Sequence, residues 1–431
     1  MTCRLNNVRI MGRVVMFVCA LMFVVSLCYF YYFLADIGSQ KLEEKTSKNM
    51  MPTIKLRNDR VYPISFGLPS NRFRTKSNSN QTVVKKRDFS TIIPGYTKGK
   101  ARYFHTEEEY YNQYSESYFG ITFKKAGWVC FRHYEIIAAG GIPFFLDIDE
   151  LPQNTMFDFP VDLIKKAMQL PGVPSIGNVS YYIQHKKLHD GDEVLSIDHD
   201  VFDVVEYNKI REKIYAYSIE SLTWSSKAKY VMQTVQMHYP CLAPQNQKIL
   251  LVSIDSCEYM SCILWGGFFE VVGTERMSSL LGAKTALFRS LSPSASSLYG
   301  SGFSYKDAFD EWDEKKMREL TTERLAGGYF NVIIFMNGAN GNCNMRDYAM
   351  GIKKYANSSS ILYNYQKMYN PIVIVVDGND IDLGCHTFFE ADVHQLQYHL
   401  HFIREFNNTY HPNMKLPLQW TGCKSNSTAN R

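Results

Sequence analysis

The stretch PIVIVVDGND (Pro371–Asp380) contains five successive β-branched residues followed by an acidic, glycine-containing turn. Such a run is typical of a short strand that is buried on both faces of a sheet. Similar apolar runs occur in KILLVSID (Lys248–Asp255), NVIIFMNG (Asn331–Gly338) and IPFFLDI (Ile142–Ile148). Because helical patterns separate these runs, the sequence predicts an α/β fold with parallel sheets that are covered on both sides.

Further elements are expected on both sides of a break near Pro240–Gln247. Two more strands are expected, at Ser180–Gln184 (SYYIQ) and Ala283–Phe288 (AKTALF). The expected helices are an acidic stretch after His105, Cys130–Gly141, Val161–Leu170, Ile219–Met237, a helix ending near Gly273, and His386–Phe406. The simplest architecture is two Rossmann-like α/β domains, covering residues 99–245 and 246–425.

The N-terminus carries an uncharged segment at Val14–Leu34, which has 21 residues. About 20 apolar residues in a helix cross a bilayer, so the segment predicts a transmembrane signal-anchor. Arg4, Arg9 and Arg13 precede it, and the positive-inside rule therefore leaves residues 1–13 in the cytosol. A cleaved signal peptide is the alternative, but its apolar core would be shorter. Residues 35–98 are polar and basic and are expected to form a stem.

Composition agrees with a luminal location for the bulk of the chain. Five Asn-x-Ser/Thr sequons and seven of the ten cysteines lie beyond the anchor, where glycosylation and disulfide formation take place. The formal net charge is only +5 in 431 residues, and no basic stripe with stacking aromatics is present, so nucleic acid is not an expected partner. The expected location is the Golgi or endoplasmic reticulum membrane.

One motif combines a core-facing and a charged helix face. In CFRHYEIIAAGG (Cys130–Gly141), Arg132 and Glu135 share an arc at 100° per residue, opposite the apolar residues. Gly140 is expected to end the helix in the left-handed conformation. A helix N-terminus, an arginine and the preceding Lys124 and Lys125 suit a diphosphate, and a carboxylate suits sugar hydroxyls.

The same residues resemble a known family. Glu135-Ile-Ile-Ala-Ala-Gly-Gly-Ile-Pro143 looks like the E-x-x-A-x-G-x-x-P element of donor-binding domains in GT-B glycosyltransferases, including the exostosin-like group. GWVCFRHYEIIAAGGIPFF also resembles a W-x-C-x-R-H-Y-E-I variant of that element. The resemblance implies that Glu135 contacts the ribose or donor sugar. The residues expected to bind the donor are Lys124, Lys125, Arg132, His133, Glu135 and Gly140.

Candidate catalytic groups follow the expected strands. Asp255, Asp377 and His386 lie at or near the carboxyl ends of parallel strands, where open α/β sheets bind ligands, and each is a candidate general base. Helix caps and turns account for the two aspartates equally well. No metal site is assigned and no cofactor is obligatory.

Three Asp-x-Asp triplets provide the metal-dependent alternative. They are Asp147-Ile-Asp149, Asp198-His-Asp200 and Asp380-Ile-Asp382. Such triplets suit Mn²⁺ or Mg²⁺, as in GT-A-type transferases, although most of them are expected to be solvated turns. Gly300-Ser-Gly302 lacks the third glycine of a dinucleotide fingerprint, so NAD binding is rejected.

The sequence therefore predicts a type II membrane glycosyltransferase that moves a sugar from a nucleotide-sugar donor to a hydroxyl of a glycan or glycoprotein acceptor. Two alternatives remain open. One is a catalytically inactive glycan-binding or scaffold relative with the same fold. The other is a metal-dependent GT-A-like transferase.

Overall fold

The structure is a computed structural model in which two compact units are distinguished, Met1–Lys55 and Leu56–Arg431. It describes residues 60–73, 84–93, 104–185, 195–253, 259–280, 285–291, 294, 298–337, 361–362, 364–378 and 398–406. All of these belong to the second unit. The expected cytosolic tail and anchor lie outside the described residues. Among the helices that are described, none is both long and apolar enough to span a membrane.

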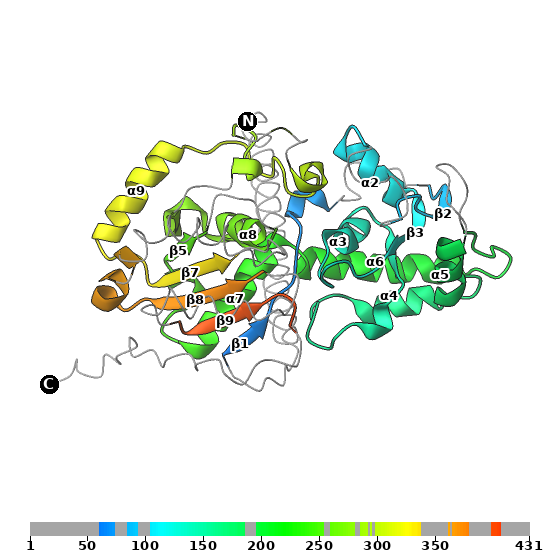
Figure 1. Ribbon diagram of the computed structural model, residues 1–431, viewed down its shortest axis with the longest axis horizontal. Coiled ribbons are helices and arrows are strands. Elements are labelled where there is room, and N and C mark those ends of the chain that lie inside the picture. Colours follow the sequence, from blue (N-terminus) through cyan, green and yellow to red (C-terminus); the bar gives the residue numbers. More distant parts are fainter. Residues whose placement is uncertain are drawn as a thin grey trace, which may run out of the picture. The chain divides into compact units, whose positions relative to one another are not determined.

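A six-stranded parallel sheet forms one layer, with the order β1-β9-β8-β7-β5-β6 (Figure 1). Its strands are β1 (Val61–Pro63), β5 (Ile249–Val252), β6 (Met277–Ser279), β7 (Val332–Asn337), β8 (Ile372–Asp377) and β9 (Leu400–Ile403). The strands β5, β8 and β9 are buried along their whole length. For β5 and β8 this burial agrees with the apolar runs in the sequence. The sequence-based expectation of an α/β fold with parallel sheets is therefore confirmed.

A second parallel sheet has three strands, β2 (Arg87–Phe89), β3 (Ser117–Thr122) and β4 (Ile142–Phe145). The helices near it are α2 (Glu107–Ser115), α3 (Phe131–Ala138), α4 (Val161–Met168), α5 (Ile176–His185) and α6 (Val204–Ser221). A capping box between Thr106 and Glu109 starts α2. The helices α2, α3 and α4 and the strand β4 occur where the sequence predicts them.

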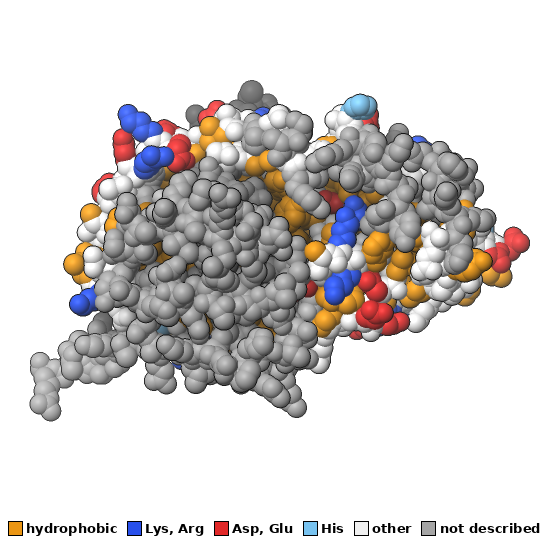
Figure 2. Space-filling view, in the orientation of Figure 1, with side chains coloured by type: hydrophobic (Ala, Val, Ile, Leu, Met, Phe, Trp, Pro, Cys, Tyr) orange, Lys and Arg blue, Asp and Glu red, His pale blue; other side chains and the backbone are white. Residues whose placement is uncertain are grey.

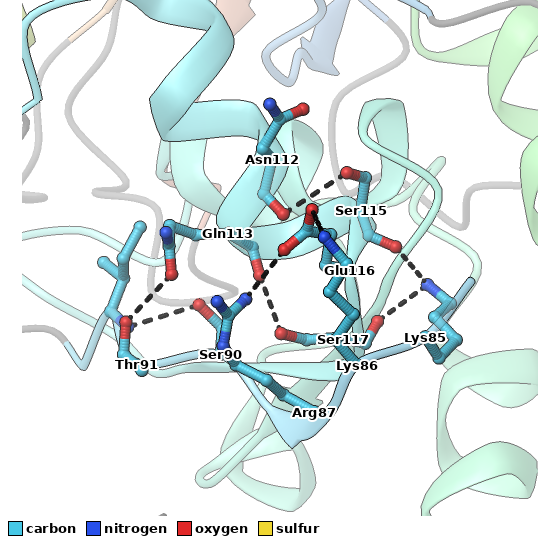
Figure 3. A network of polar contacts seen from close by, with 11 residues as sticks. Lys85, Lys86, Arg87, Ser90, Thr91, Asn112, Gln113, Ser115, Glu116 and Ser117 are labelled. Atoms are coloured by element: carbon cyan, nitrogen blue, oxygen red, sulfur yellow. Dashed lines mark hydrogen bonds and ion pairs between the residues drawn. The ribbon is translucent and has the colours of Figure 1, made fainter. Parts of the chain in front are cut away.

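The edge strand β2 is attached to α2 by charged residues (Figure 3). The Lys85 ammonium donates to the carbonyls on either side of Glu116, at 2.9 and 2.7 Å, and to the Gly140 carbonyl at 3.0 Å. The Glu116 carboxylate pairs with Lys86 at 2.7 Å and with Arg87 at 3.1 Å. These contacts join β2 to the ends of α2 and α3, where helix carbonyls lack intrahelical partners.

Three further helices accompany the six-stranded sheet: α7 (Trp224–His238), α8 (Tyr259–Arg276) and α9 (Glu314–Ala326). The helices α7 and α8 approach closely because Gly266 and Gly267 leave room for Trp224; a Cβ atom at either glycine would lie 2.3 or 2.2 Å from a Trp224 atom. Short 3₁₀ helices cover Ser70–Arg72, Ile148–Glu150, Pro244–Asn246, Thr285–Leu287 and Tyr299–Gly302.

Among the segments expected from the sequence, the stem at residues 35–98 differs most from what the structure shows. Its residues 60–73 and 84–93 include β1 and β2, and β1 pairs with β9 in the larger sheet. Ile64, Phe66 and Leu68 are each at most 1% exposed. These residues alternate with less apolar neighbours, a period typical of a strand, and their burial explains why this part cannot be a free spacer. The two sheets therefore do not divide the chain simply at residue 245.

Other local predictions were wrong. Ser180–Gln184 belongs to helix α5, in which Val179 and Ile183 are buried four residues apart. Residues 285–287 form a 3₁₀ helix instead of a strand, and 400–403 form the strand β9 within the segment expected to be helical. The single helix expected at Ile219–Met237 is two helices, because Thr223 caps the start of α7. Residues 386–397 lie outside the described part of the chain.

Candidate functional site

The site is built on helix α3, which ends at the glycine pair. Gly140 adopts a φ of +83°, and a Cβ atom there would meet nothing within 4 Å, so the expected left-handed helix end is confirmed. Gly140 closes the C-terminal end of α3, whereas Arg132 lies in its first turn. The Gly140 carbonyl accepts a hydrogen bond from the Lys85 ammonium at 3.0 Å. The structure thus gives Gly140 a capping role at the end of α3 away from Arg132.

The carboxylate of Glu135 is buried among hydroxyl groups. Its residue is 8% exposed. Tyr110 donates to one carboxylate oxygen at 2.6 Å, and the Ser304 hydroxyl donates to the other. Tyr111 in turn donates to Ser304 at 3.4 Å. Because a carboxylate has about four acceptor positions, each oxygen keeps capacity for a further donor.

Burial changes the acidity of the hydroxyl groups around Glu135. Desolvation, followed by the charge of Glu135, raises the pKa of Tyr110 and of Tyr111 well above the usual value. Both phenols therefore stay protonated and serve as hydrogen-bond donors at any physiological pH. The arrangement provides a neutral, donor-rich setting for one carboxylate.

Arg132 lies on the same face of α3 as Glu135, but fewer of its polar atoms have hydrogen-bond partners. Its Nε and Nη1 atoms are buried and have no hydrogen-bond partner in the described part of the chain. No ion pair joins Arg132 to Glu135 among the described residues. Burial acts to lower the pKa of Arg132, but its electrostatic interactions with Tyr114, Tyr110, Cys130 and Glu135 outweigh burial, and the pKa is raised. The guanidinium therefore carries a charge and, besides a hydrogen bond with Tyr114, two buried donors that have no partner among the described residues. An anion is the usual partner of such a group.

His133 has a structural position. It is fully buried, its Nε2 donates to the Trp128 carbonyl at 2.9 Å, and its Nδ1 accepts from Thr122 at 2.8 Å. Burial first, and then the charges of Arg132 and Lys125, lower the pKa of His133 to about 3. Because both ring nitrogens are used inside the fold, His133 holds the loop before α3 instead of contacting a ligand.

The lysine loop before α3 is exposed. The backbone N–H of Lys124 donates to the Asp147 carboxylate at 3.0 and 3.2 Å, and its ammonium lies 5.0 Å from the centre of the Trp128 ring. Lys125 follows it, and its backbone N–H closes a short turn onto the Gly127 carbonyl at 3.2 Å. Both side chains are solvent-accessible, so the structure leaves them able to meet an incoming anion.

The two aspartate triplets that the structure describes, Asp147-Ile-Asp149 and Asp198-His-Asp200, do not form a metal centre. Asp147 binds the lysine loop, Asp149 pairs with Lys165 at 2.5 Å, and Asp198 accepts from the backbone of Asp200 at 3.1 Å. In the described residues no group of three His, Cys, Asp or Glu side chains is placed to hold a metal ion. Asp380 and Asp382 lie outside those residues.

The carboxyl edge of the six-stranded sheet contacts the loop before α3. The carboxylate of Glu405, two residues beyond β9, accepts from the backbone N–H groups of Trp128 and Val129 at 3.0 and 2.9 Å. Asp377 ends β8 and is 8% exposed, and its carbonyl accepts from the Arg404 backbone at 3.0 Å. Asp255 and His386 lie outside the described residues.

Aromatic packing reinforces this junction. Arg404 is 2% exposed and lies 4.9 Å from the centre of the Phe66 ring, which in turn lies 4.8 Å from Phe131 of α3. Tyr259, at the start of α8, contacts Phe131 edge-on at 4.6 Å. Sequence reasoning missed Tyr110, Ser304 and Glu405, because each belongs to a segment far from α3 in the chain. No spacing in the sequence indicates these contacts.

Comparison with known proteins adds no relative. No family model, curated protein or solved structure matches this chain. The resemblance of the α3 motif to GT-B donor-binding elements therefore stays a prediction that depends on these residues alone.

Proposed function

We propose that this chain is a type II membrane glycosyltransferase of the GT-B type that transfers a sugar from a nucleotide-sugar donor to a hydroxyl acceptor. The observation that supports it most is Arg132, a charged guanidinium with two buried nitrogens that lack partners among the described residues, beside a carboxylate on the same helix. The carboxyl edge of a parallel sheet, the usual ligand-binding edge of open α/β folds, contacts the loop before that helix.

In this proposal the residues have distinct roles. The acceptor oxygen forms a bond to the anomeric carbon of the sugar while the bond from that carbon to the diphosphate oxygen breaks. Arg132, assisted by Lys124 and Lys125, neutralises the charge that develops on the leaving diphosphate. Glu135 accepts from ribose or sugar hydroxyls. Among the described residues Asp377 is the remaining candidate for the base that removes the acceptor proton.

The proposed luminal location has support from the cysteines. Cys241 and Cys262 each form a disulfide bond. Disulfides persist in the secretory pathway and are rare in the cytosol. The sequon at Asn178 is exposed on the first turns of α5, where a glycan would not disturb the core. These features agree with a protein whose bulk lies in the Golgi or endoplasmic reticulum lumen.

The experiment is thermal stabilisation of the chain by UDP, GDP, CMP and their sugars, with and without Mn²⁺. We expect one nucleotide class to raise the melting temperature, because binding to the folded state alone stabilises it. Arg132→Gln should abolish this shift. Arg318→Gln, at an exposed arginine of α9, is the matched control and should leave it unchanged. Absence of any shift, or an equal shift in Arg132→Gln, would refute the proposal.

A second candidate is a catalytically inactive glycan-binding or scaffold relative. One observation favours it: both oxygens of Glu135 already accept hydrogen bonds from Tyr110 and Ser304 inside the protein. In that case no nucleotide would stabilise the chain, whereas a glycan would. The metal-dependent GT-A-like alternative predicts that Mn²⁺ is required for the nucleotide shift.

A further inference from the structure

A pocket of 710 Å³ lies beside the loop that joins β4 to α4. This volume is in the range of small-molecule sites. Polar side chains among its lining are Asp149, Gln153, Asp162 and Lys165, and aromatic ones include Phe157 and Tyr217. The loop leaves the carboxyl end of β4, the edge at which open α/β sheets bind ligands.

A buried ion pair holds this loop in place. The Asp158 carboxylate accepts from the Lys227 ammonium and from the Ser65 hydroxyl, and Lys227 is 1% exposed. Tyr217, which lines the pocket, donates to the Asp158 carbonyl at 2.9 Å. Thr155 donates to a carbonyl just beyond β9 at 2.9 Å. Four separate contacts thus hold the wall of the pocket in place.

One residue of the loop has an unfavourable backbone conformation. Met156 has a φ of +52° and is 1% exposed. A residue other than glycine in the left-handed region costs about 1 kcal/mol or more of conformational free energy. Such strained residues occur often at ligand-binding sites. The surrounding contacts maintain this strained shape, so the pocket is formed before any ligand arrives.

The lining matches the two kinds of surface that a sugar ring presents. Phe157 and Tyr217 are partly exposed aromatic residues of the lining, and aromatic rings are surfaces against which the apolar face of a pyranose packs. Gln153 and Asp162 are exposed, and their side chains make no hydrogen bond or ion pair among the described residues. Amide and carboxylate groups at the rim are the partners that sugar hydroxyls need. Figure 2 shows acidic and hydrophobic side chains side by side where Figure 1 places α4.

The charged residues of the lining limit which glycans the pocket can bind. Asp149 is neutralised by Lys165 at 2.5 Å, which leaves the carboxylate of Asp162 as the uncompensated charge among the described lining residues. A sulphate or uronate placed against Asp162 would be repelled. We infer that this pocket binds a neutral glycan, and that under the proposed function it is the site of the acceptor.

The pocket is separate from the Arg132 and Glu135 pair. Phe159, which lines the pocket, packs against Tyr134 with ring centres 5.3 Å apart. Tyr134 thus packs towards the pocket wall, whereas Glu135 contacts Tyr110 and Ser304. Only the name "acceptor" rests on the proposed function, because glycan binding here needs no nucleotide.

The test is binding of the full-length chain to an array of immobilised neutral, sulphated and uronate-containing glycans, without nucleotide and in a detergent that has no sugar headgroup. Asp162→Asn and Gln153→Ala are the pocket variants. Asp200→Asn, at an exposed aspartate of another loop, is the matched control. Arg132→Gln is included to separate this pocket from the nucleotide site.

We expect a neutral glycan to bind, and each pocket variant to weaken that binding about tenfold or more, as loss of a hydrogen bond to a charged or amide group does. Asp200→Asn and Arg132→Gln should bind as the wild type does. Failure of every neutral glycan to bind, preference for sulphated glycans, or full binding by both pocket variants would overturn the inference. Glycan binding without nucleotide binding would refute the proposed function and leave this inference standing.

Discussion

At the scale of single residues, His133 makes the stability of the protein depend on pH. Its pKa in the folded protein is about 3, against 6.5 for an ordinary histidine. Between these values the unfolded chain binds the additional proton, so the stability that neutral His133 contributes is present above pH 6.5 and is lost as the pH falls towards 3. The free energy of unfolding should decrease by about 1.4 kcal/mol per pH unit in this window from His133 alone.

Chemical denaturation of wild type and His133→Gln between about pH 4 and pH 7.5 measures this effect. The variant should be less stable than wild type at the upper end of this range and should depend less steeply on pH. His105→Gln, at an exposed histidine, should keep the wild-type dependence. Equal slopes in His133→Gln and wild type would show that His133 is not the buried neutral group described above.

The buried pair of Lys227 and Asp158 provides a second residue-scale prediction. Their side chains are 2% and 14% exposed. Asp158→Ala should lower the free energy of unfolding by about 3–5 kcal/mol, because it leaves the buried Lys227 charge without a counter-charge and with only the Ser221 carbonyl as an acceptor among the described residues. Arg318→Ala, which breaks the exposed pair with Glu314, should cost less than about 1 kcal/mol. Urea denaturation compares the two, and similar losses would contradict the account.

At the scale of elements, the contact between α7 and α8 depends on glycine. A Cβ atom at Gly267 would lie 2.2 Å from the Trp224 carbonyl oxygen, a backbone atom that cannot turn away. Gly267→Ala should therefore destabilise the protein by about 1–3 kcal/mol or more. Gly177→Ala in α5, where the nearest atom would be 3.9 Å away, should instead stabilise it by about 0.5–1 kcal/mol. Thermal unfolding of both variants checks the opposite signs.

Strands that are buried on both faces were predictable from sequence, because a short uninterrupted apolar run that ends at turn residues suits such a strand better than a helix. This holds for β4, β5, β7 and β8. Two short strands were missed: β1, at the edge of the larger sheet, has three residues within a polar region, and β9, beside it, lies in a segment that contains charged residues and histidines. Their strand conformation depends on pairing with each other, a contact between positions far apart in the chain.

The candidate site, like the fold, was predictable from the sequence only where local patterns determine it. The helical wheel placed Arg132 and Glu135 together, since that requires only local periodicity. The partners of Glu135 come from α2 and from the segment after Gly302, so no local pattern indicates them. His133 was assigned to the ligand because a sequence does not distinguish a buried histidine from an accessible one.

At the scale of the whole molecule, residues 60–73 and 84–93 of the expected stem belong to the folded unit. They contribute β1 and β2, and Phe66 packs against α3. A fragment that starts at residue 56 should unfold cooperatively, whereas one that starts at residue 99 should not, because it lacks two strands and exposes buried aromatic surface. Near-ultraviolet circular dichroism during heating distinguishes them. A cooperative transition in the shorter fragment would show that these residues are a spacer after all.

Release of free nucleotide from nucleotide sugars shows whether Arg132 neutralises a leaving diphosphate. The full-length chain would be incubated with UDP-, GDP- and CMP-sugars and a pool of neutral glycan acceptors, beside Arg132→Gln and Arg318→Gln. We expect wild type and Arg318→Gln to release nucleotide from UDP- or GDP-sugars, whose leaving group is a diphosphate, and not from CMP-sugars, whose leaving group is a monophosphate. Arg132→Gln should release at least about a hundredfold less. Release from no donor, or equal release by Arg132→Gln, would contradict this expectation.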